Sequence, residues 1–367
     1  MIKVKKRKIR DTRLFLKENY KAFLSVLLLA IFGIINQLGM GEARSYFIKN
    51  LLWHTIGIGI FVVFTFFADY RKLTLRILWI FYGMVLFLLF LTLFTKKRWL
   101  YIGPISLQPS EFLKPVLVLI VAKIVSDKVS EYLNFKTLVS LLAIIYFPLF
   151  LVLLKDLDFA FIMGITFFIY LIFLGIRKQV IVTFGVICLI LGILGGPILW
   201  KKLKPHQRGR IYAYLYPEKY SKTWAYQLEQ SLIAIGSGGI KGQGFRKGWS
   251  TRLNYLPAKT TDLAFSVWAE SWGLIGSTIV LVIYGYLVWF CIEISESARD
   301  WFGKYLSLGV GLILLFQIFF NVGGVTGLLP MTSIPFPFLS YGGSITITVY
   351  FLLSLVFNVA FKRYFFK

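Results

Sequence analysis

The sequence predicts an all-α polytopic membrane protein with about ten transmembrane helices and one large extracytoplasmic loop between helices seven and eight. Of the 367 residues, 58% are hydrophobic and 18% are aromatic. The mean hydropathy of +0.75 excludes an ordinary water-soluble domain. The apolar residues form runs long enough to cross a hydrocarbon core, which takes roughly 20 helical residues. Because a bilayer core offers no water to the backbone, each run is expected to be a helix.

Ten apolar segments are expected to span the membrane, with boundaries uncertain by about two to four residues. They are residues 22–38, 51–67, 75–94, 112–126, 138–154, 159–176, 180–199, 263–292, 306–322 and 346–361. The domain plan is a basic arm at 1–21, helices one to seven within 22–199, the external loop at 200–262, helices eight to ten within 263–361 and a tail at 362–367. An even number of spans returns both termini to one side.

The distribution of charge predicts the orientation in the membrane. Lys and Arg number 41 against 16 Asp and Glu, and nine of the basic residues lie within the first 21. The positive-inside rule places this arm, and with it both termini, in the cytoplasm. The basic residues lie mainly in the arm and the loops, where they are expected to meet anionic lipids, and no nucleic-acid partner is expected. Cys188 and Cys291 lie in apolar runs and offer no disulfide framework.

The loop at 200–262 combines a strong positive charge with many glycines. It carries twelve Lys and Arg against three acidic residues, a net charge of +9, which predicts an anionic partner. Its glycines between 236 and 248 match no nucleotide-binding fingerprint and fit either a flexible turn or a cradle for a lipid phosphate. Asp262 ends the loop, where it serves either as the N-terminal cap of the next helix or as a catalytic base at the membrane surface.

Four ionisable or polar side chains are expected inside the helices. Glu111 and Lys114 are three residues apart on one helical face and form either a structural ion pair or part of a functional cavity. Glu270 lies within a spanning segment and is a functional candidate for that reason. For His54 a hydrogen-bonded packing role is favoured over metal binding.

A segment at 323–345, between the last two apolar runs, has no charged residue but too many Pro and Gly for a helix. It is expected to be a re-entrant loop buried against protein, because irregular backbone at membrane depth normally lines a cavity. The candidate cavity residues in and beside it are Asn321, Thr326, Pro330, Ser340, Tyr341, Gly342, Gly343 and Ser344.

From Asp69 to the end, the chain resembles the SEDS family of bacterial cell-wall polymerases. The motifs that carry the resemblance are Gln108 to Lys114, Arg210-Ile211, Tyr226-Gln227 with Gln230-Ser231 and the residues to Gly239, Leu256 to Asp262, and Asn321 to Ser344. Pro335-Phe336-Pro337 looks like the Pro-Leu-Pro of the family's elongation branch. The pattern departs from the family at Ala258 and Thr260, at Ser271, at Gln243, and around Asp156 and Ala160. Where the family usually has a Glu and a His before its aspartate, this chain has Ala258 and Thr260.

The resemblance implies a peptidoglycan glycosyltransferase in the bacterial cytoplasmic membrane that polymerises lipid II, with the undecaprenyl-linked glycan as its product. It places the family's essential aspartate on Asp262, as the base in an inverting transfer. The expected ligands of the substrate are Arg210 and Lys259, then Arg208, Lys241, Gln230 and Ser231. A class B penicillin-binding protein is the expected transpeptidase partner.

Some alternatives stay open from the sequence. No cofactor is certain; a divalent cation beside the pyrophosphate is one alternative, and the metal ligands are unknown. A flippase or transporter for lipid-linked precursors is the rival function, although the charged residues gather on one external face and form no evident path through the midplane. A non-catalytic scaffold for a transpeptidase is the third interpretation.

Overall fold

The structure is a computed structural model. It describes residues 2–41, 44–95, 98–103, 105–128, 135–175, 205–220 and 225–366, with positions 179, 182, 183, 186, 190, 200, 201 and 223. The expected helix at 180–199 lies outside these stretches except for four single positions. The seventh expected span is therefore neither supported nor contradicted.

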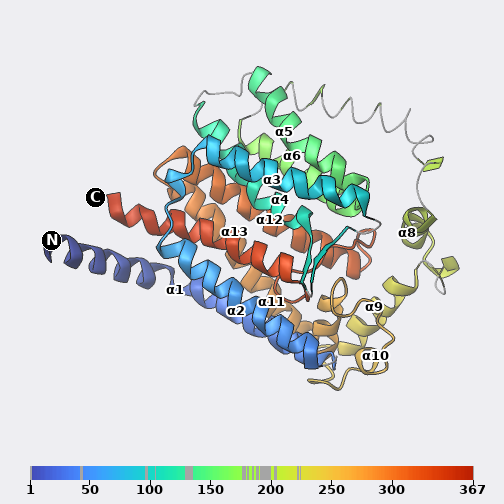
Figure 1. Ribbon diagram of the computed structural model, residues 1–367. Coiled ribbons are helices and arrows are strands. Elements are labelled where there is room, and N and C mark those ends of the chain that lie inside the picture. The colour runs from blue at the N-terminus through green and yellow to red at the C-terminus, as the bar shows by residue number, and fades with distance from the viewer. Residues whose placement is uncertain are drawn as a thin grey trace.

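The described chain is a bundle of long helices with one small hairpin (Figure 1). The helices are α1 (Ile2–Gly39), α2 (Arg44–Phe66), α3 (Leu75–Phe94), α4 (Pro109–Ser126), α5 (Phe135–Leu153), α6 (Leu157–Phe173), α8 (Pro205–Leu215), α9 (Tyr226–Gly238), α10 (Trp249–Arg252), α11 (Ala264–Ser297), α12 (Trp301–Val325) and α13 (Gly343–Lys362). Short 3₁₀ turns occupy Tyr70–Lys72, Glu218–Tyr220 and Arg363–Phe366. Strands β1 (Leu100–Ile102) and β2 (Ile105–Leu107) pair antiparallel.

The all-α membrane architecture is confirmed. Seven of the described helices are long and apolar enough to cross a bilayer, namely α1, α2, α3, α5, α11, α12 and α13. Helix α6 is apolar but shorter, and α4 contains Glu111, Lys114 and Lys123. The total of ten spans stays a prediction.

Several of the described helices are longer than the expected segments; α2 begins at Arg44 and α12 at Trp301, where 51 and 306 were expected. The basic arm is not separate from the first span, because α1 runs from Ile2 without interruption; straight-chain Lys and Arg are good helix formers. Helix α11 is broken at Gly273, where φ is 64° and ψ is −161°. This backbone region is open essentially to glycine alone.

Helix α13 lies in the centre of the bundle and packs against α2, α4 and α12. Its Tyr350, Val356 and Phe357 are fully buried. Glycine permits the closest approach to α2, since a Cβ atom at Gly57 would lie 2.1 Å from the Tyr350 ring. Helices α2 and α3 instead expose many large apolar side chains, as expected for surfaces that face lipid.

The glycine-rich stretch of the external loop is fastened to the break in α11. The amides of Gln243 and Gly244 donate to the carbonyls of Glu270 and Ser271 at 2.9 and 3.0 Å. In the other direction, the amides of Leu274 and Ile275 donate to the carbonyls of residues 239 and 240 at 2.9 and 3.1 Å. The amides of Gln243 and Gly244 are thus already used by backbone carbonyls and are not free to donate to a phosphate. Glycine allows this close approach of the loop backbone to α11, since a Cβ atom at Gly242 would lie 2.2 Å from the Ser271 carbonyl oxygen.

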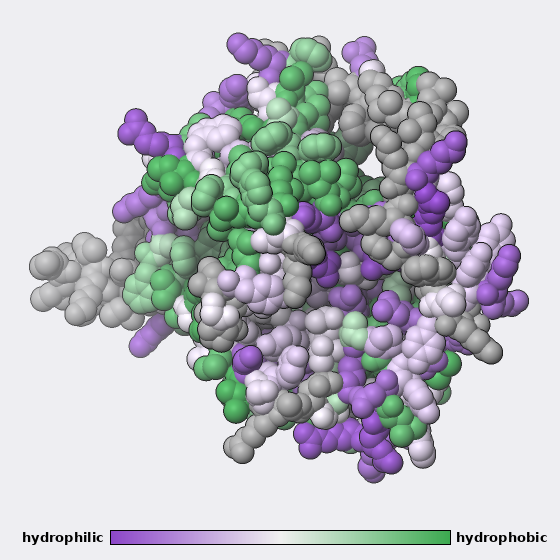
Figure 2. All heavy atoms as spheres, turned by 45° about the vertical axis from the view of Figure 1, so that its right-hand side comes forward, coloured by the Kyte–Doolittle hydropathy of each residue, from purple (hydrophilic) through white to green (hydrophobic). Residues whose placement is uncertain are grey.

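One end of the bundle gathers the irregular and polar parts of the chain. At this Asp262 end, α1 finishes and α2, α4, α6, α11 and α13 begin, while both chain termini lie at the opposite side of the picture (Figure 1). Hydrophilic residues spread across the face that turns toward the viewer in Figure 2, and hydrophobic residues cover the surface above it.

Candidate active site

The segment that carries Asp262 is held by its backbone. The Tyr341 amide donates to the Thr260 carbonyl at 2.7 Å, and the Ser340 hydroxyl donates to the Thr261 carbonyl at 2.5 Å. The Asn321 side-chain amide donates to the Asp262 carbonyl at 3.2 Å. Two of these three successive carbonyls are therefore fixed by the segment between α12 and α13, and the third is fixed by Asn321 of α12. The half-buried Asp262 lies at this end of the bundle.

Two ion pairs surround this carboxylate. Arg98 pairs with Asp156 at 2.6 Å, and Arg210 pairs with Asp158 at close range. Ser333 joins the pairs: its hydroxyl accepts from Arg98 at 3.1 Å, and its amide donates to Asp158 at 3.0 Å. Together with Asp262, these residues are called the Asp262 cluster below.

The environment tunes the proton affinity of Asp262. Burial raises the pKa of its carboxyl group above the ordinary value, and the charge of Asp156 raises it further. The positive charges of Arg98 and Arg210 and a hydrogen bond from Thr261 lower the pKa, but burial is the largest effect. A carboxylate with a raised pKa is a better proton acceptor, which a general base requires.

Sequence reasoning missed Arg98 and Asp158 and treated Asp156 only as a poor motif match. Arg98 follows an apolar run and looks like an ordinary membrane-flanking cation. Asp156 caps α6 by accepting from the Phe159 amide at 3.3 Å, and Asp158 lies in the first turn, so both fit helix-start chemistry. The available signal was the clustering of two acids at the start of an apolar segment.

Of the basic residues predicted to hold substrate, Arg210 belongs to the Asp262 cluster. Arg208 instead donates to the Lys201 carbonyl at 2.6 Å. The buried Lys259 ammonium donates to the Met40 carbonyl at 3.1 Å and to Asn254 Oδ1 at 2.6 Å, toward the end of α1. Lys241 is exposed within the glycine-rich stretch.

The two polar candidates on α9 differ in exposure. Gln230 is half-buried. Ser231 is fully buried, and its hydroxyl lies 2.8 Å from that of Ser266 and donates to the Val325 carbonyl at 2.7 Å. This position favours a role in joining α9 to α11 and α12 over contact with substrate.

The expected pair in α4 is confirmed as a buried ion pair. Lys114 Nζ lies 2.8 Å from Glu111 Oε2, and both side chains are 2% exposed. The same ammonium donates to Gln317 Oε1 at 3.2 Å, and Gln317 donates to the Pro335 carbonyl at 3.2 Å. The pair is thereby linked to the segment that holds Asp262.

The uncharged segment between α12 and α13 is irregular, as predicted, and residues 336–340 are buried. Ser344 accepts from the Gln108 amide at 3.0 Å, which joins α13 to the start of α4. Gly343 leaves room for the Trp53 ring, since a Cβ atom there would lie 2.4 Å from it. The remaining candidates lie at the edges of the segment: Thr326 caps α12, Pro330 is exposed and Gly342 precedes α13.

Two other polar candidates, Glu270 and His54, make hydrogen bonds within the protein. Glu270 is fully buried and accepts from the Ser250 and Thr251 amides at 2.7 and 3.1 Å, so it caps the short helix α10. His54 Nδ1 lies 3.1 Å from the Tyr350 hydroxyl, which agrees with the expected hydrogen-bonded packing role.

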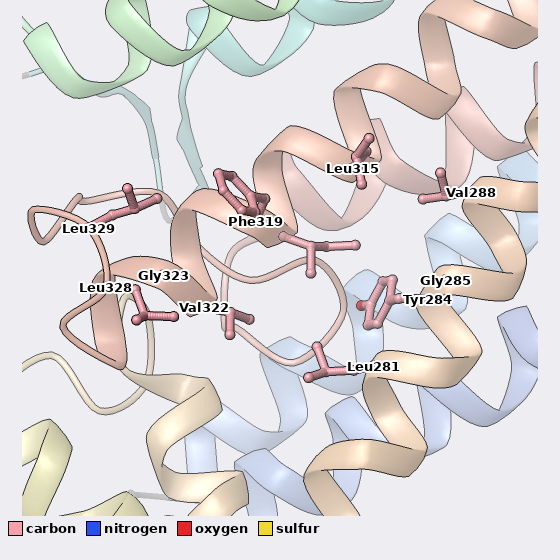
Figure 3. Close-up of a pocket in the computed structure, with 11 residues that line it drawn as sticks. Leu281, Tyr284, Gly285, Val288, Leu315, Phe319, Val322, Gly323, Leu328 and Leu329 are labelled. Atoms are coloured by element: carbon pink, nitrogen blue, oxygen red, sulfur yellow. The ribbon is translucent and has the colours of Figure 1, made fainter.

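Three cavities lie along the helices. One of 450 Å³ adjoins the Asp262 segment at Thr261 and is lined by the aromatic side chains of Trp53, Trp99, Tyr101 and Tyr341. A second, of 410 Å³, is almost wholly apolar and lies between α2, α3, α4 and α13. The third, of 430 Å³, is an apolar groove between α11 and α12, into which Tyr284 and Phe319 project (Figure 3). Grooves of this kind suit hydrocarbon chains.

A metal site is not evident in the part of the chain that the structure describes. Within it, no group of three or more His, Cys, Asp or Glu side chains is placed to hold an ion. The chemistry of the cluster is that of the Asp262 carboxylate beside two guanidinium groups, each of which is paired with another aspartate.

Comparison with known proteins agrees with this picture. Residues 14–364 match the FtsW/RodA/SpoVE family of cell cycle proteins. The chain is 34% identical to the Escherichia coli peptidoglycan glycosyltransferase MrdB over 73% of this chain and 71% of that protein. It is 31% identical to the probable peptidoglycan glycosyltransferase FtsW of Geobacter sulfurreducens over 94% and 96%, and 32% identical to the stage V sporulation protein E of Bacillus subtilis over 73% of each.

Solved structures share the fold. A chain from a peptidoglycan synthase complex superposes with a TM-score of 0.75 at 24% identity, over 95% of this chain and 98% of that one. The rod shape determining protein RodA of Thermus thermophilus gives a TM-score of 0.67 at 22% identity, over 94% and 96%. The chain thus belongs to the FtsW/RodA/SpoVE family of multi-pass membrane proteins. Within that class it is a glycosyltransferase.

Proposed function

We propose that this glycosyltransferase polymerises lipid II into glycan strands during cell elongation, with Asp262 as the catalytic base. The names of the relatives from E. coli and Geobacter support peptidoglycan as the product. The Pro335-Phe336-Pro337 sequence supports a RodA-type role in elongation, although FtsW, MrdB and SpoVE relatives match the chain at similar identities.

The observation that carries the proposal is the placement of one carboxylate with a raised pKa beside two guanidinium groups. In an inverting transfer, the acceptor hydroxyl attacks the anomeric carbon opposite the leaving group. Asp262 takes the hydroxyl proton as the new glycosidic bond forms and the bond to pyrophosphate breaks. One carboxylate suffices, because pyrophosphate leaves without protonation once cations neutralise its developing charge.

Arg98 and Arg210 are the cations best placed for that task. Each is held by a single carboxylate, Asp156 or Asp158, and each side chain keeps about a third of its surface exposed, at 33% and 35%. A pyrophosphate carries more charge than one carboxylate and offers bidentate acceptors. The two arginines would therefore turn from their aspartates toward the substrate without leaving the cluster.

The lipid parts of the substrates fit the rest of the molecule. The apolar grooves between α11 and α12 and between α2, α3 and α4 have room for polyprenyl chains (Figure 3). In this scheme the Asp262 end faces the outside of the cytoplasmic membrane, and both termini lie in the cytoplasm. The solved synthase complex supports a transpeptidase of the penicillin-binding class as partner.

Purified protein with labelled lipid II tests the proposal. Wild type should yield glycan polymer on a gel, whereas Asp262→Asn protein of equal yield should not. A protein that moves lipid II across vesicle membranes without making polymer would support the flippase alternative. A protein that neither polymerises nor transports, but binds a transpeptidase, would support the scaffold alternative.

A further inference from the structure

A separate cavity of 440 Å³ lies between the end of α1 and the loop around α10. Gly39 and Met40 are among the residues that line it, and so are three basic residues, Arg246, Arg252 and Lys259. Since a water molecule takes about 30 Å³, the cavity has room for a hydrated phosphate group. Its residues are not those of the Asp262 cluster.

The lining of this cavity is cationic. Arg246 reaches it from a left-handed backbone position, with φ of 60°, and its Nε donates to the Leu38 carbonyl at 3.0 Å. Asn254 also lines the cavity and also has a left-handed backbone, with φ of 58°. No carboxylate lines the cavity among the described residues. The nearby Glu270 is buried beneath Gly248, and its oxygens accept hydrogen bonds from Ser250 and Thr251.

The surface around the cavity is apolar and aromatic. Trp249 is 63% exposed, and Phe245, Leu253 and Tyr255 are also exposed. The Arg252 guanidinium lies over the Trp249 ring at 5.6 Å, and that of Arg246 lies over Phe245 at 5.5 Å. Exposed aromatic residues mixed with arginine are typical of the layer where lipid headgroups meet hydrocarbon. A soluble anion would gain nothing from these exposed apolar and aromatic side chains, whereas the chain of a lipid would pack against them.

We propose that this cavity binds the phosphate group of a membrane lipid. Arg246 and Arg252 contact the phosphate oxygens, and Trp249 and its neighbours contact the upper part of the acyl or prenyl chain. The phosphate belongs either to an anionic phospholipid or to a lipid-linked pyrophosphate. The site acts independently of proton transfer at Asp262.

The test compares full-length variants in lipid nanodiscs with and without phosphatidylglycerol. Arg246→Gln/Arg252→Gln removes two charges from the cavity, and Lys219→Gln/Lys247→Gln removes two from exposed positions that do not line it. Native mass spectrometry after detergent extraction counts the phosphatidylglycerol retained. The cavity variant should retain about 30-fold less, from two charges near a lipid surface. The control should match wild type.

Enzyme kinetics show which of the two lipids carries the phosphate. If phosphatidylglycerol retention is equal in all variants but KM for a lipid-linked pyrophosphate rises in the cavity variant alone, the phosphate is that of the substrate. Equal behaviour of cavity and control variants in both assays would overturn the proposal. If the double variant does not fold, the single variant Arg252→Gln is tested in its place, because it keeps the hydrogen bond from Arg246 to α1. Asp262→Asn protein should retain lipid as wild type does, even if no polymerase activity is found.

Discussion

The hydroxyl of Ser340 donates a 2.5 Å hydrogen bond to the carbonyl oxygen of Thr261, the residue directly before Asp262. The same hydroxyl accepts from the Phe336 amide at 2.8 Å. The uncharged segment between α12 and α13 thus fixes the backbone of the candidate base without contributing a charge. An arrangement of this kind holds a catalytic carboxylate through its main chain and leaves its oxygens for substrate.

The first prediction concerns Asp262→Asn. Polymerisation should fall by about 10² to 10⁴, the usual contribution of a general base. Stability should not fall. Burial raises the pKa of this carboxyl in the folded state, so its stabilising effect exists at low pH and is lost as pH rises through the folded pKa. Above the folded pKa the ionised group lowers the stability, so the Asn variant should melt there at the same temperature or higher. Polymer synthesis at the wild-type rate would remove Asp262 from the base role.

The second prediction is a pair of opposite pH shifts. A base acts when deprotonated, so kcat/KM should rise with pH through the pKa of Asp262. Arg98→Gln removes a cation that lowers this pKa and should move the acidic limb to higher pH. Asp156→Asn removes an anion that raises it and should move the limb to lower pH, while Asn still caps α6. Shifts of the same sign in both variants would contradict the assignment.

These residues also show what the sequence could and could not predict. The apolar runs predicted which segments form the long described helices, because lipid-facing spans are set by composition, and 75–94 is the helix found. They predicted the helix ends less well, since α1 begins at Ile2 and α2 at Arg44, where 22 and 51 were expected. The i, i+3 spacing predicted the Glu111–Lys114 pair, because a helix fixes neighbours three apart. The pairs of Arg98 with Asp156 and Arg210 with Asp158 join residues 58 and 52 apart. Such partners depend on how helices pack, which periodicity does not determine.

The third prediction addresses Glu111 and Lys114. Glu111→Gln or Lys114→Met alone should destabilise the protein by about 3 to 5 kcal/mol, because each leaves a buried charge without its partner. The double variant should cost less than the sum of the two. Thermal unfolding in detergent and polymerisation rate are the measurements. The more accessible pair of Lys123 with Asp127 at 3.1 Å, with side chains 22% and 44% exposed, is the control, and its changes should cost less than about 1 kcal/mol. Additive losses at Glu111 and Lys114 would mean that the pair is not coupled.

The fourth prediction tests the break in α11. Gly273→Ala should destabilise the protein by about 1 to 3 kcal/mol from backbone strain alone. The added Cβ would also lie 2.3 Å from the Gly242 amide nitrogen. Gly285→Ala in the same helix meets no atom within 4 Å and should be neutral or stabilise by up to about 1 kcal/mol. The unfolding midpoints of the two proteins give the comparison. Equal midpoints would mean that the backbone at Gly273 does not require glycine.

The last prediction separates a focal pyrophosphate site from a diffuse attraction to lipid. In a diffuse patch each charge contributes about 1 kcal/mol and no single position dominates. Arg210 lies in the Asp262 cluster, whereas Lys201 is an exposed residue whose carbonyl accepts from Arg208. Arg210→Ala should therefore reduce lipid II turnover far more than Lys201→Ala.

Arg210→Lys should restore only part of that loss, because an ammonium cannot make the two parallel hydrogen bonds of a guanidinium. Initial rates against lipid II concentration, at fixed salt and lipid composition, give the comparison. Raising the salt should weaken the contribution of Lys201 more than that of Arg210, since exposed charges are screened more strongly than half-buried ones. Small and equal losses for Arg210→Ala and Lys201→Ala would favour the diffuse patch and exclude Arg210 from the pyrophosphate site, while the role of Asp262 would stand.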